Sequence, residues 1–502
     1  MTQPNVFRAG LRPFGLRWRS SIWFITLVVS TGIVTDLIIY SIVIPVLPYQ
    51  LELKGYTSVS TLVGYLLFAY SGGLLISTPI IAWISERFSA RQMPLIFGLL
   101  ALTGSQIMLM EAPSYLVMAL ARVIQGISSS AVWIVGLALL QVFLCDTTPE
   151  HLIGQQLGLA MSGLSLGRSK LICVFRMLLG PPIGGALYSR FGFRAPFVFT
   201  IIITVVDLIG RLLLIERNDA LKYGHDPAEV AVKAKEEHHR AHAIGKKSCL
   251  EGEYPRPSEY EVARELAPPP TLVAPRLSNF KVVLKLARSS RALVSLMSTL
   301  IYGYVLLGFY LYTSQEPTLP LHLQQVWRLN SSKVGLVFIA AVVPTLFSSP
   351  IAGYFADRRG SEWITTSCIV LTIPWWIVIT IDGPLALFIT AYALQNLFIS
   401  GVLAPLTAEL ASVARMLQGV GYAHIYGAFN MAYGIGSTVG PIIGSQMYEH
   451  TKRGWMALNL LAVGLLAFAA LSTFIYTGER PLLTRLVSKI RSSSPEEALH
   501  NR

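Results

Sequence analysis

Long apolar runs follow one another along almost the whole chain, and each is about as long as a helix that crosses a bilayer. A hydrocarbon core of about 30 Å needs roughly 20 helical residues at 1.5 Å each. Only 13% of the 502 residues are charged, against roughly 25% in soluble domains. The chain is therefore predicted to be an all-α integral membrane protein with twelve transmembrane helices. Their expected limits are 21–47, 60–84, 94–112, 115–141, 152–188, 195–215, 292–314, 334–356, 363–381, 385–408, 417–448 and 455–477.

The net charge of +13 is distributed unevenly between the two predicted sides of the membrane. If the N-terminus is cytoplasmic, 28 of the 40 Lys and Arg residues fall in inside segments and seven in outside loops. Basic residues concentrate on the cytoplasmic side of membrane proteins, so both termini are expected there. The basic balance is then an orientation signal, and no nucleic-acid partner is expected.

A hydrophilic stretch at residues 216–291 divides the predicted spans six and six. We expect a cytoplasmic tail over 1–20, a six-helix bundle over 21–215, a cytoplasmic linker over 216–291, a second bundle over 292–477 and a cytoplasmic tail over 478–502. The linker contains His238, His239 and His242. We interpret them as part of a solvated charged run and expect neither a metal nor another cofactor.

The two halves repeat short patterns. Pro45-Val-Leu-Pro48 recurs at 317–320 with an offset of 272, and Gly180-Pro181 recurs at 440–441 with an offset of 260. A charged motif after the second run recurs after the eighth with an offset of 271. Two homologous six-helix bundles around a midplane cavity are the architecture of a secondary transporter.

The charged motif has the form Gly-x-x-x-Asp-Arg-x-Gly in its second copy, whereas the first copy has Ala82 and Ser89 in place of the glycines. Charges at helix ends can latch neighbouring helices through charge-assisted hydrogen bonds; the alternative is ordinary loop charge. The pair of motifs resembles the loop motif of the major facilitator superfamily, and the likeness covers roughly residues 20–480. The motif residues are Glu86, Arg87, Arg91, Gly353, Asp357 and Arg358.

The fourth run carries Arg122-Val-Ile-Gln125-Gly126. This resembles the Arg-x-x-Gln-Gly motif of the twelve-span drug:proton antiporters within that superfamily. An arginine inside hydrocarbon costs about 2.5–3.5 kcal/mol on insertion scales, so it needs a partner or an aqueous cavity. The resemblance implies that Arg122 and Gln125 act in proton coupling. A buried arginine tied to backbone carbonyls is the structural alternative.

The fifth run is too long for one crossing and contains three cations, Arg168, Lys170 and Arg176. Removing residues 168–176 aligns its glycines with the antiporter signature Gly-x8-Gly-x3-Gly-Pro-x-x-Gly-Gly and brings the three half-to-half offsets to 263, 262 and 260. Nine extra residues add about 2.5 helical turns, which would place the first two glycines on the opposite face. The segment is predicted to be an error in the predicted gene structure or an insertion that impairs transport. The motif residues are Gly158, Gly167, Gly180, Pro181, Gly184 and Gly185.

Acids inside spans are candidates for binding a substrate or a proton, because their burial is costly. The spacing from Asp36 to Pro45 and the Glu316-Pro-x-Leu-Pro segment resemble the vesicular amine transporters, which carry an aspartate where this chain has Asn430. Glu409 is a further candidate, with a carboxylate satisfied by Tyr or Ser as its alternative. Asp207 lies four residues before Arg211, and an i,i+4 pair explains it.

The sequence therefore predicts a secondary active transporter, a proton-coupled antiporter that exports an amphipathic or cationic organic molecule such as a drug, toxin or secondary metabolite. The chain also resembles the fungal multidrug and metabolite efflux transporters. We expect a monomer in the plasma membrane rather than a vacuolar or vesicular one, with small molecules, protons and the lipid bilayer as its partners. No nucleotide-binding motif of the form Gly-x4-Gly-Lys-Ser/Thr occurs, which disfavours an ATP-driven pump. A membrane enzyme is the next class to consider, but no paired His/Asp spacing suggests a metal or nucleophilic centre, so the chain is not expected to be an enzyme. A non-transporting sensor, a transporter of an organic acid and a copy inactivated by residues 168–176 remain alternatives.

Overall fold

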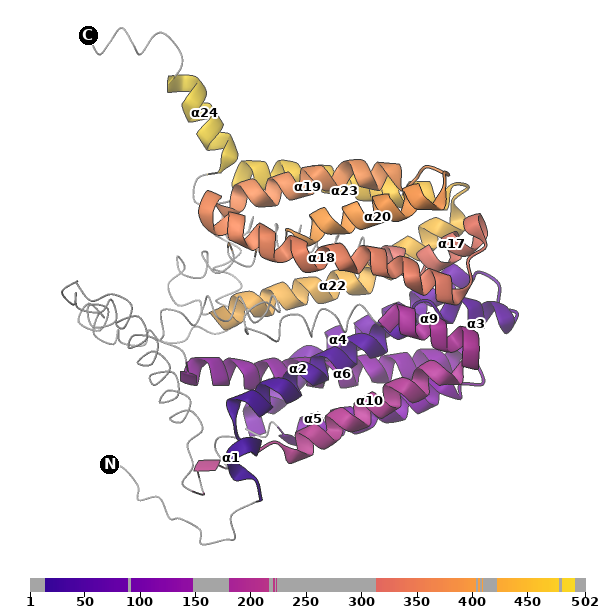
Figure 1. The fold of residues 1–502 in the computed structure, drawn as a ribbon, viewed down its shortest axis with the longest axis vertical. Helices are drawn as coiled ribbons and strands as arrows, with labels where there is room; N and C mark the ends of the chain where they lie inside the picture. The colour runs from indigo at the N-terminus through magenta and orange to yellow at the C-terminus, as the bar shows by residue number, and fades with distance from the viewer. Residues whose placement is uncertain are drawn as a thin grey trace, which may run out of the picture.

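The computed structural model describes residues 14–88, 92–147, 180–215, 220–221, 223, 313–402, 405–406, 409, 422–477 and 481–492. These residues form helices joined by short turns, without a strand among them (Figure 1). The helices are α1 (Leu16–Arg19), α2 (Ile22–Ile42), α3 (Leu47–Leu53), α4 (Val59–Phe88), α5 (Gln92–Met110), α6 (Tyr115–Thr147), α9 (Gly180–Phe191), α10 (Arg194–Leu213), α17 (Leu319–Trp327), α18 (Ser331–Arg359), α19 (Ser361–Val378), α20 (Leu385–Ser400), α22 (Tyr422–His450), α23 (Gly454–Tyr476) and α24 (Leu482–Ser492).

The helices coincide with the predicted apolar runs. The first four runs, the sixth, and the eighth to twelfth each contain a helix along most of their length. Of the fifth run only the end, α9, is described, and the seventh, at 292–314, lies almost wholly outside the described residues. Among the residues that are described, five helices are long and apolar enough to cross a membrane, or six if the bent pair α17–α18 is one span. The arrangement is consistent with twelve spans.

The first span differs from its predicted limits. Helix α2 ends at Ile42, residues 43–46 form a turn, and α3 starts at Leu47, whereas a continuous span to 47 was expected. Pro45 and Pro48 explain the break, because a proline lacks the N–H that a continuing helix needs. The same break recurs before α17, where residues 316–318 form a turn around Pro317. The repeated Pro-x-Leu-Pro pattern therefore marks a bend in both halves.

Helix α10 shows an inverted distribution of polarity. Its buried side chains include Thr200, Thr204, Asp207 and Arg211. Its exposed side chains are apolar, namely Val198, Ile202, Val205, Val206, Ile209, Leu212 and Leu213. A helix in water buries its apolar face, so apolar groups outside and polar groups inside are expected where lipid surrounds the protein.

Two groups of helices lie side by side. In Figure 1, α2, α4, α5, α6, α9 and α10 form one group and α18, α19, α20, α22 and α23 the other. Between the groups, α9 packs against α18 and α4 packs against α22. We call the end that carries α1 and α24 the terminal end, and the end that carries α3 and α17 the far end.

Hydrogen bonds join the two groups at the far end. The Tyr49 hydroxyl donates to the Leu329 carbonyl at 2.8 Å, and Gln324 Nε2 donates to Glu52 Oε2 at 2.8 Å. Ile44 from the first group is buried in the apolar cluster around α17 and α18. The far end is therefore closed by both polar and apolar contacts.

Candidate functional site

Asp36 lies on α2 and is 2% exposed. Its Oδ2 atom accepts three hydrogen bonds: from Ser129 Oγ at 2.6 Å, from Trp133 Nε1 at 2.8 Å and from the Tyr70 hydroxyl at 3.2 Å. Its Oδ1 atom is buried and has no hydrogen-bond partner among the described residues. One carboxylate oxygen is thus held by α4 and α6, and the other remains available to a proton, a water molecule or a ligand.

Arg122 lies beside Asp36 on α6 and is fully buried. Its Nη1 atom donates to Gln125 Oε1 at 2.9 Å, and Nε donates to the Leu66 carbonyl at 3.4 Å. The guanidinium lies 4.9 Å from the centre of the Tyr70 ring and 5.9 Å from that of Tyr40. Its Nη2 atom has no partner within the described part of the chain. One backbone carbonyl is too few to satisfy this group, so a purely structural role leaves a buried donor unexplained.

Glu316 lies in the turn before α17 and is 2% exposed. Its Oε2 atom accepts a 2.5 Å hydrogen bond from the Tyr40 hydroxyl of α2. Its Oε1 atom has no partner among the residues with described positions. The rings of Tyr40 and Tyr70 are 5.0 Å apart, so a continuous path of side chains joins the two predicted acids.

We call this group the central polar cluster: Asp36, Tyr40, Tyr70, Arg122, Gln125, Ser129, Trp133 and Glu316. The structure brings together four residues that the sequence predicted, Asp36, Arg122, Gln125 and Glu316. It adds Tyr40, Tyr70, Ser129 and Trp133. Helical spacing is a signal that could have identified three of these, because Tyr40 lies one turn after Asp36, and Ser129 and Trp133 continue the face of α6 that carries Arg122.

Neither acid of the cluster forms an ion pair with a residue whose position is described. Within the described residues the salt bridges are Arg194–Glu111, Arg211–Asp207 and Arg485–Glu362. Arg122 instead faces the two tyrosine rings that separate the acids. Buried carboxylates without a cation partner are costly when ionised, and such groups inside a membrane protein commonly carry protons or cationic ligands.

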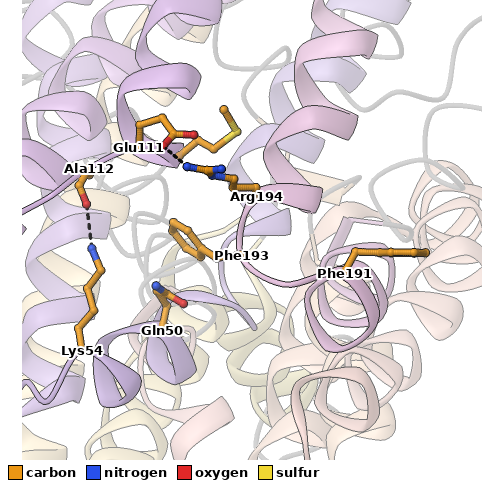
Figure 2. Close-up of a pocket in the computed structure, with 8 residues that line it drawn as sticks. Gln50, Lys54, Glu111, Ala112, Phe191, Phe193 and Arg194 are labelled. Carbon is orange, nitrogen blue, oxygen red and sulfur yellow. Dashed lines mark hydrogen bonds and ion pairs between the residues drawn. The ribbon is translucent and has the colours of Figure 1, made fainter.

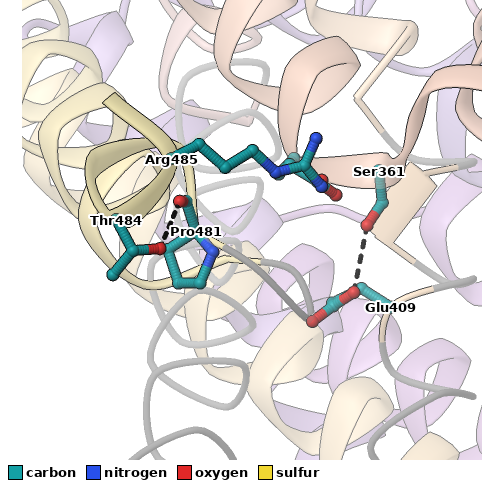
Figure 3. Close-up of polar contacts among 6 residues, drawn as sticks. Ser361, Glu409, Pro481, Thr484 and Arg485 are labelled. Carbon is teal, nitrogen blue, oxygen red and sulfur yellow. Dashed lines mark hydrogen bonds and ion pairs between the residues drawn. The ribbon is translucent and has the colours of Figure 1, made fainter. Parts of the chain in front are cut away.

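The other predicted acids lie apart from the cluster. Asp207 Oδ2 accepts from Arg211 Nε at 3.0 Å, as the i,i+4 spacing predicted. Glu409 is buried at the terminal end and accepts a 3.0 Å hydrogen bond from Ser361 Oγ (Figure 3). Asn430 lies on α22, but the structure does not describe its side chain.

The predicted loop motif occupies two helix ends. Glu86 and Arg87 belong to the last turn of α4, and Gly353, Asp357 and Arg358 to the end of α18. The Arg358 guanidinium lies 4.3 Å from the centre of the Tyr354 ring. The side chains of Glu86, Arg87 and Asp357, and the whole of Arg91, lie outside what is described, so the latch role stays a prediction.

The described part of the antiporter motif lies where α9 meets its neighbours. A methyl group on Gly184 would overlap the Ile42 carbonyl of α2, and one on Gly185 would overlap the Ser331 carbonyl of α18. A methyl group on Gly335 of α18 would lie 2.6 Å from the Pro181 carbonyl. These glycines let α9 approach both halves closely. Gly158, Gly167 and residues 168–176 lie outside the described residues.

A shallow cleft of about 390 Å³ opens at the far end (Figure 2), and none of the residues that line it belongs to the central polar cluster. Its basic side chains are already engaged, because Lys54 Nζ donates to the Ala112 carbonyl at 2.8 Å and Arg194 pairs with Glu111 at 2.6 Å. Both contacts join a helix end, that of α3 at Lys54 or of α10 at Arg194, to the turn after α5. We therefore assign the cleft a structural role and place the candidate site at the central polar cluster.

A sequence model of the Major Facilitator Superfamily matches residues 29–317 and again residues 305–498. The chain belongs to the major facilitator superfamily. Among curated superfamily members, the MFS-type transporter ppzB of Metarhizium rileyi is 24% identical over 93% of this chain and 97% of its own length. An uncharacterized MFS-type transporter of Schizosaccharomyces pombe is 23% identical over 91% of this chain and 95% of its own. The rat synaptic vesicular amine transporter is 20% identical over 82% of this chain and 66% of its own.

Solved structures of the superfamily share the fold. The human organic anion transporter MFSD10 (TETRAN) covers 90% of this chain and 99% of its own with a TM-score of 0.57 at 16% identity. The nucleoside transporter NupG covers 89% of this chain and 98% of its own with a TM-score of 0.56 at 10% identity. The all-α major facilitator architecture predicted from the repeated motifs is thereby confirmed. The chain is a multi-pass membrane protein of a superfamily whose members carry small molecules.

Proposed function

We propose that this chain is a proton-coupled antiporter that exports an amphipathic or cationic small organic molecule. The observation that carries the proposal is the pair of buried carboxylates, Asp36 and Glu316, which lack a cation partner among the described residues. A site that binds either a proton or an organic cation, but not both, exchanges one for the other without further machinery. The resemblance to vesicular amine transporters supports a cationic substrate.

The cluster also supports the roles of its other members. Asp36 binds the cation or the proton, and Arg122 with Gln125 sets the electrostatic balance beside it. Tyr40, Tyr70 and Trp133 offer aromatic faces that attract organic cations. Glu316 couples the protonation or ligand-bound state of Asp36 to the second six-helix bundle, through its hydrogen bond from Tyr40. Asn430 on α22 is proposed as a substrate contact, and Glu409 as a second protonation site at the terminal end.

The closed far end supports an assignment of conformation. Superfamily members work by alternating access, in which the two bundles rock around a central site. We propose that both termini are cytoplasmic and that the structure is inward-facing, with the glycines of α9 sealing the outer side. Residues 1–20, 216–291 and 478–502 are then cytoplasmic, the bundles span 21–215 and 292–477, and the chain works as a monomer in the plasma membrane.

The test is proton-driven export from proteoliposomes under an imposed pH gradient, screened over organic cations, acids and toxins. Asp36→Asn keeps one acceptor oxygen for Ser129, Trp133 and Tyr70 but removes the titratable charge. We expect it to abolish pH-driven export. Thr35→Val is the matched control, because Thr35 is the adjacent buried residue and its hydroxyl has no partner among the described residues.

Undiminished pH-driven export by Asp36→Asn would contradict the role of this residue. Binding of a substrate without flux in the unsubstituted chain would instead indicate a sensor.

An organic-acid transporter is a second candidate, favoured by the unpartnered Nη2 atom of buried Arg122. A guanidinium with a free donor is suited to a carboxylate. Flux of acids rather than cations, lost in Arg122→Gln and retained in Asp36→Asn, would support this candidate over the first.

A further inference from the structure

The last described helix, α24, lies outside the helical bundle. It begins at Leu482, six residues after α23 ends at Tyr476, so it leaves the bundle close to the end of a transmembrane span. Figure 1 shows α24 (yellow) running steeply across the direction of α19 and α23 and outward past the edge of the bundle. Beyond that edge, the surroundings of a membrane protein at this level are lipid headgroups.

The sequence of α24, LLTRLVSKIRS, is amphipathic. Leucine, valine and isoleucine occupy positions 482, 483, 486, 487 and 490, which cover one side of a helix, and the polar residues cover the other. Leu482 is buried against the protein, whereas Leu483, Leu486 and Val487 are 37%, 49% and 53% exposed. Most of the described apolar face is therefore not covered by the bundle.

All charged residues of α24 are basic. The helix contains Arg485, Lys489 and Arg491 and has no acidic residue. Basic residues beside an exposed apolar stripe match a bilayer surface, which offers acyl chains below and anionic headgroups above. A partner helix in water would cover the apolar stripe but would not require Lys489 and Arg491 beside it.

An ion pair fixes how α24 meets the bundle. Arg485 Nη2 donates to Oε1 of Glu362, a buried residue in the first turn of α19 (Figure 3 shows Arg485 beside this turn). The pair lies next to Ser361 and Glu409, at the turn that follows the second loop motif. With Arg485 held by Glu362 and Leu482 buried, the side that carries Leu483, Leu486 and Val487 is left to face away from the protein.

We infer that α24 is an interfacial anchor that lies on the bilayer surface next to α19 and α23, inserts Leu483, Leu486 and Val487 among the acyl chains and binds anionic lipid headgroups through Lys489 and Arg491. The inference does not depend on the transported substrate. It holds for an antiporter, a sensor or an inactive copy, because it rests only on membrane insertion of the bundle and on the surface of α24.

The experiment uses the full chain, without its four native cysteines, in nanodiscs. A single cysteine at position 486 or 488 carries an environment-sensitive fluorophore, and lipids with a nitroxide in the acyl chain act as quenchers. Position 486 is on the apolar side and position 488 on the polar side. The discs contain phosphatidylcholine alone or with 30% phosphatidylglycerol (about one anionic lipid in three).

We expect strong quenching at position 486 and weak quenching at position 488, with the difference largest in anionic discs. Replacing Lys489 and Arg491 with Gln should lower the surface-bound to free ratio of α24 roughly 25-fold, from about fivefold for each basic residue near an anionic surface. Salt at about 0.5 M should act in the same direction in the unsubstituted helix.

Equal quenching at positions 486 and 488 would overturn the inference. Quenching that changes neither with lipid charge nor with the double substitution of Lys489 and Arg491 would also overturn it. A fluorophore at position 486 that is shielded from water and not quenched by the nitroxide lipids would show that protein, rather than lipid, covers this face. Size-exclusion profiles identical to that of the unsubstituted chain would exclude misfolding of the variants. Because α24 lies outside the bundle, we expect the substitutions to cause no misfolding.

Discussion

Removal of the Tyr40 hydroxyl should open the far end of the molecule. The hydroxyl donates to Glu316 at 2.5 Å and joins α2 to the turn before α17, while the ring packs on Tyr70. Tyr40→Phe deletes the hydroxyl with its hydrogen bond to Glu316 and keeps the ring. A hydrogen bond to an ionised group contributes about 1.5–3 kcal/mol, so at a pH where Glu316 is ionised its loss should reduce the equilibrium population of this conformation relative to others roughly 10- to 150-fold.

Distances between spin labels across the far end measure this equilibrium. Leu53 on α3 and Val326 on α17 are 78% and 41% exposed, and they belong to different halves. Labelled cysteines at these positions, in a chain without its four native cysteines, report closed and open forms as two distances. We expect Tyr40→Phe to shift the distribution from the short to the long distance.

Tyr49→Phe is the matched control. Tyr49 also bridges the halves, but its acceptor is the uncharged Leu329 carbonyl at 2.8 Å. The expected loss is about 0.5–1.5 kcal/mol, or roughly 2- to 12-fold, and independent of pH. The effect of Tyr40→Phe should instead shrink as pH falls, because protonated Glu316 is a weaker acceptor than the carboxylate. Equal, pH-independent shifts in the two variants, or no shift in Tyr40→Phe, would refute the reasoning.

Two further predictions concern helix packing, and a third concerns residues 168–176. A methyl group in Gly126→Ala would overlap the Tyr70 carbonyl, so we expect the substitution to destabilise the protein by about 1–3 kcal/mol. Thermal unfolding of the detergent-solubilised protein measures this loss. Gly104→Ala is the control and should unfold like the parent, because no atom lies within 4 Å of the added methyl group. Gly184→Ala should displace α9 from α2 and lengthen the label distance at the far end, and Gly464→Ala, which also has nothing within 4 Å, should not. Deletion of residues 168–176 should raise pH-driven export; lower export, or a peptide from Ile172 to Phe175 in the purified native protein, would contradict an error in the predicted gene structure.

The apolar runs were sufficient to predict most described helices, because hydrocarbon selects for length and apolarity more strictly than water does. The runs could not show the bend at residues 43–46, since isoleucine, valine and leucine continue through it. Pro45 and Pro48 were noted as repeat markers, although they also break the helix. A proline rule applied inside the run would have placed the end of α2 correctly.

Only the charged residues of the central polar cluster, together with Gln125, were predicted from the sequence. Asp36, Arg122 and Glu316 are recognisable because a charge inside a span demands an explanation. Tyr40 and Trp133 give no such signal, since aromatic residues are common in spans and most only pack. The hydrogen bond from Tyr40 to Glu316 joins residues 276 positions apart, and spacing along the chain carries no information about it. For the same reason the sequence could not separate Glu409, at the terminal end beside Ser361, from the acids of the cluster.

The repeat offsets nevertheless predict how the far end is sealed. Gly184 lies against the Ile42 carbonyl, and Gly444 lies against Ser314, which are the same contact displaced by 260 and 272 residues. Likewise a methyl on Gly64 would lie 2.7 Å from the Pro441 carbonyl, and one on Gly335 would lie 2.6 Å from that of Pro181. In the contact of Gly64 with Pro441 the glycine belongs to the first half, and in the contact of Gly335 with Pro181 it belongs to the second half. The far end therefore has two equivalent contact lines between the halves, which we call seams. Because rocking of one bundle against the other moves both halves together, the two seams must open in one step, and a bulky residue in either should weaken the closure of both.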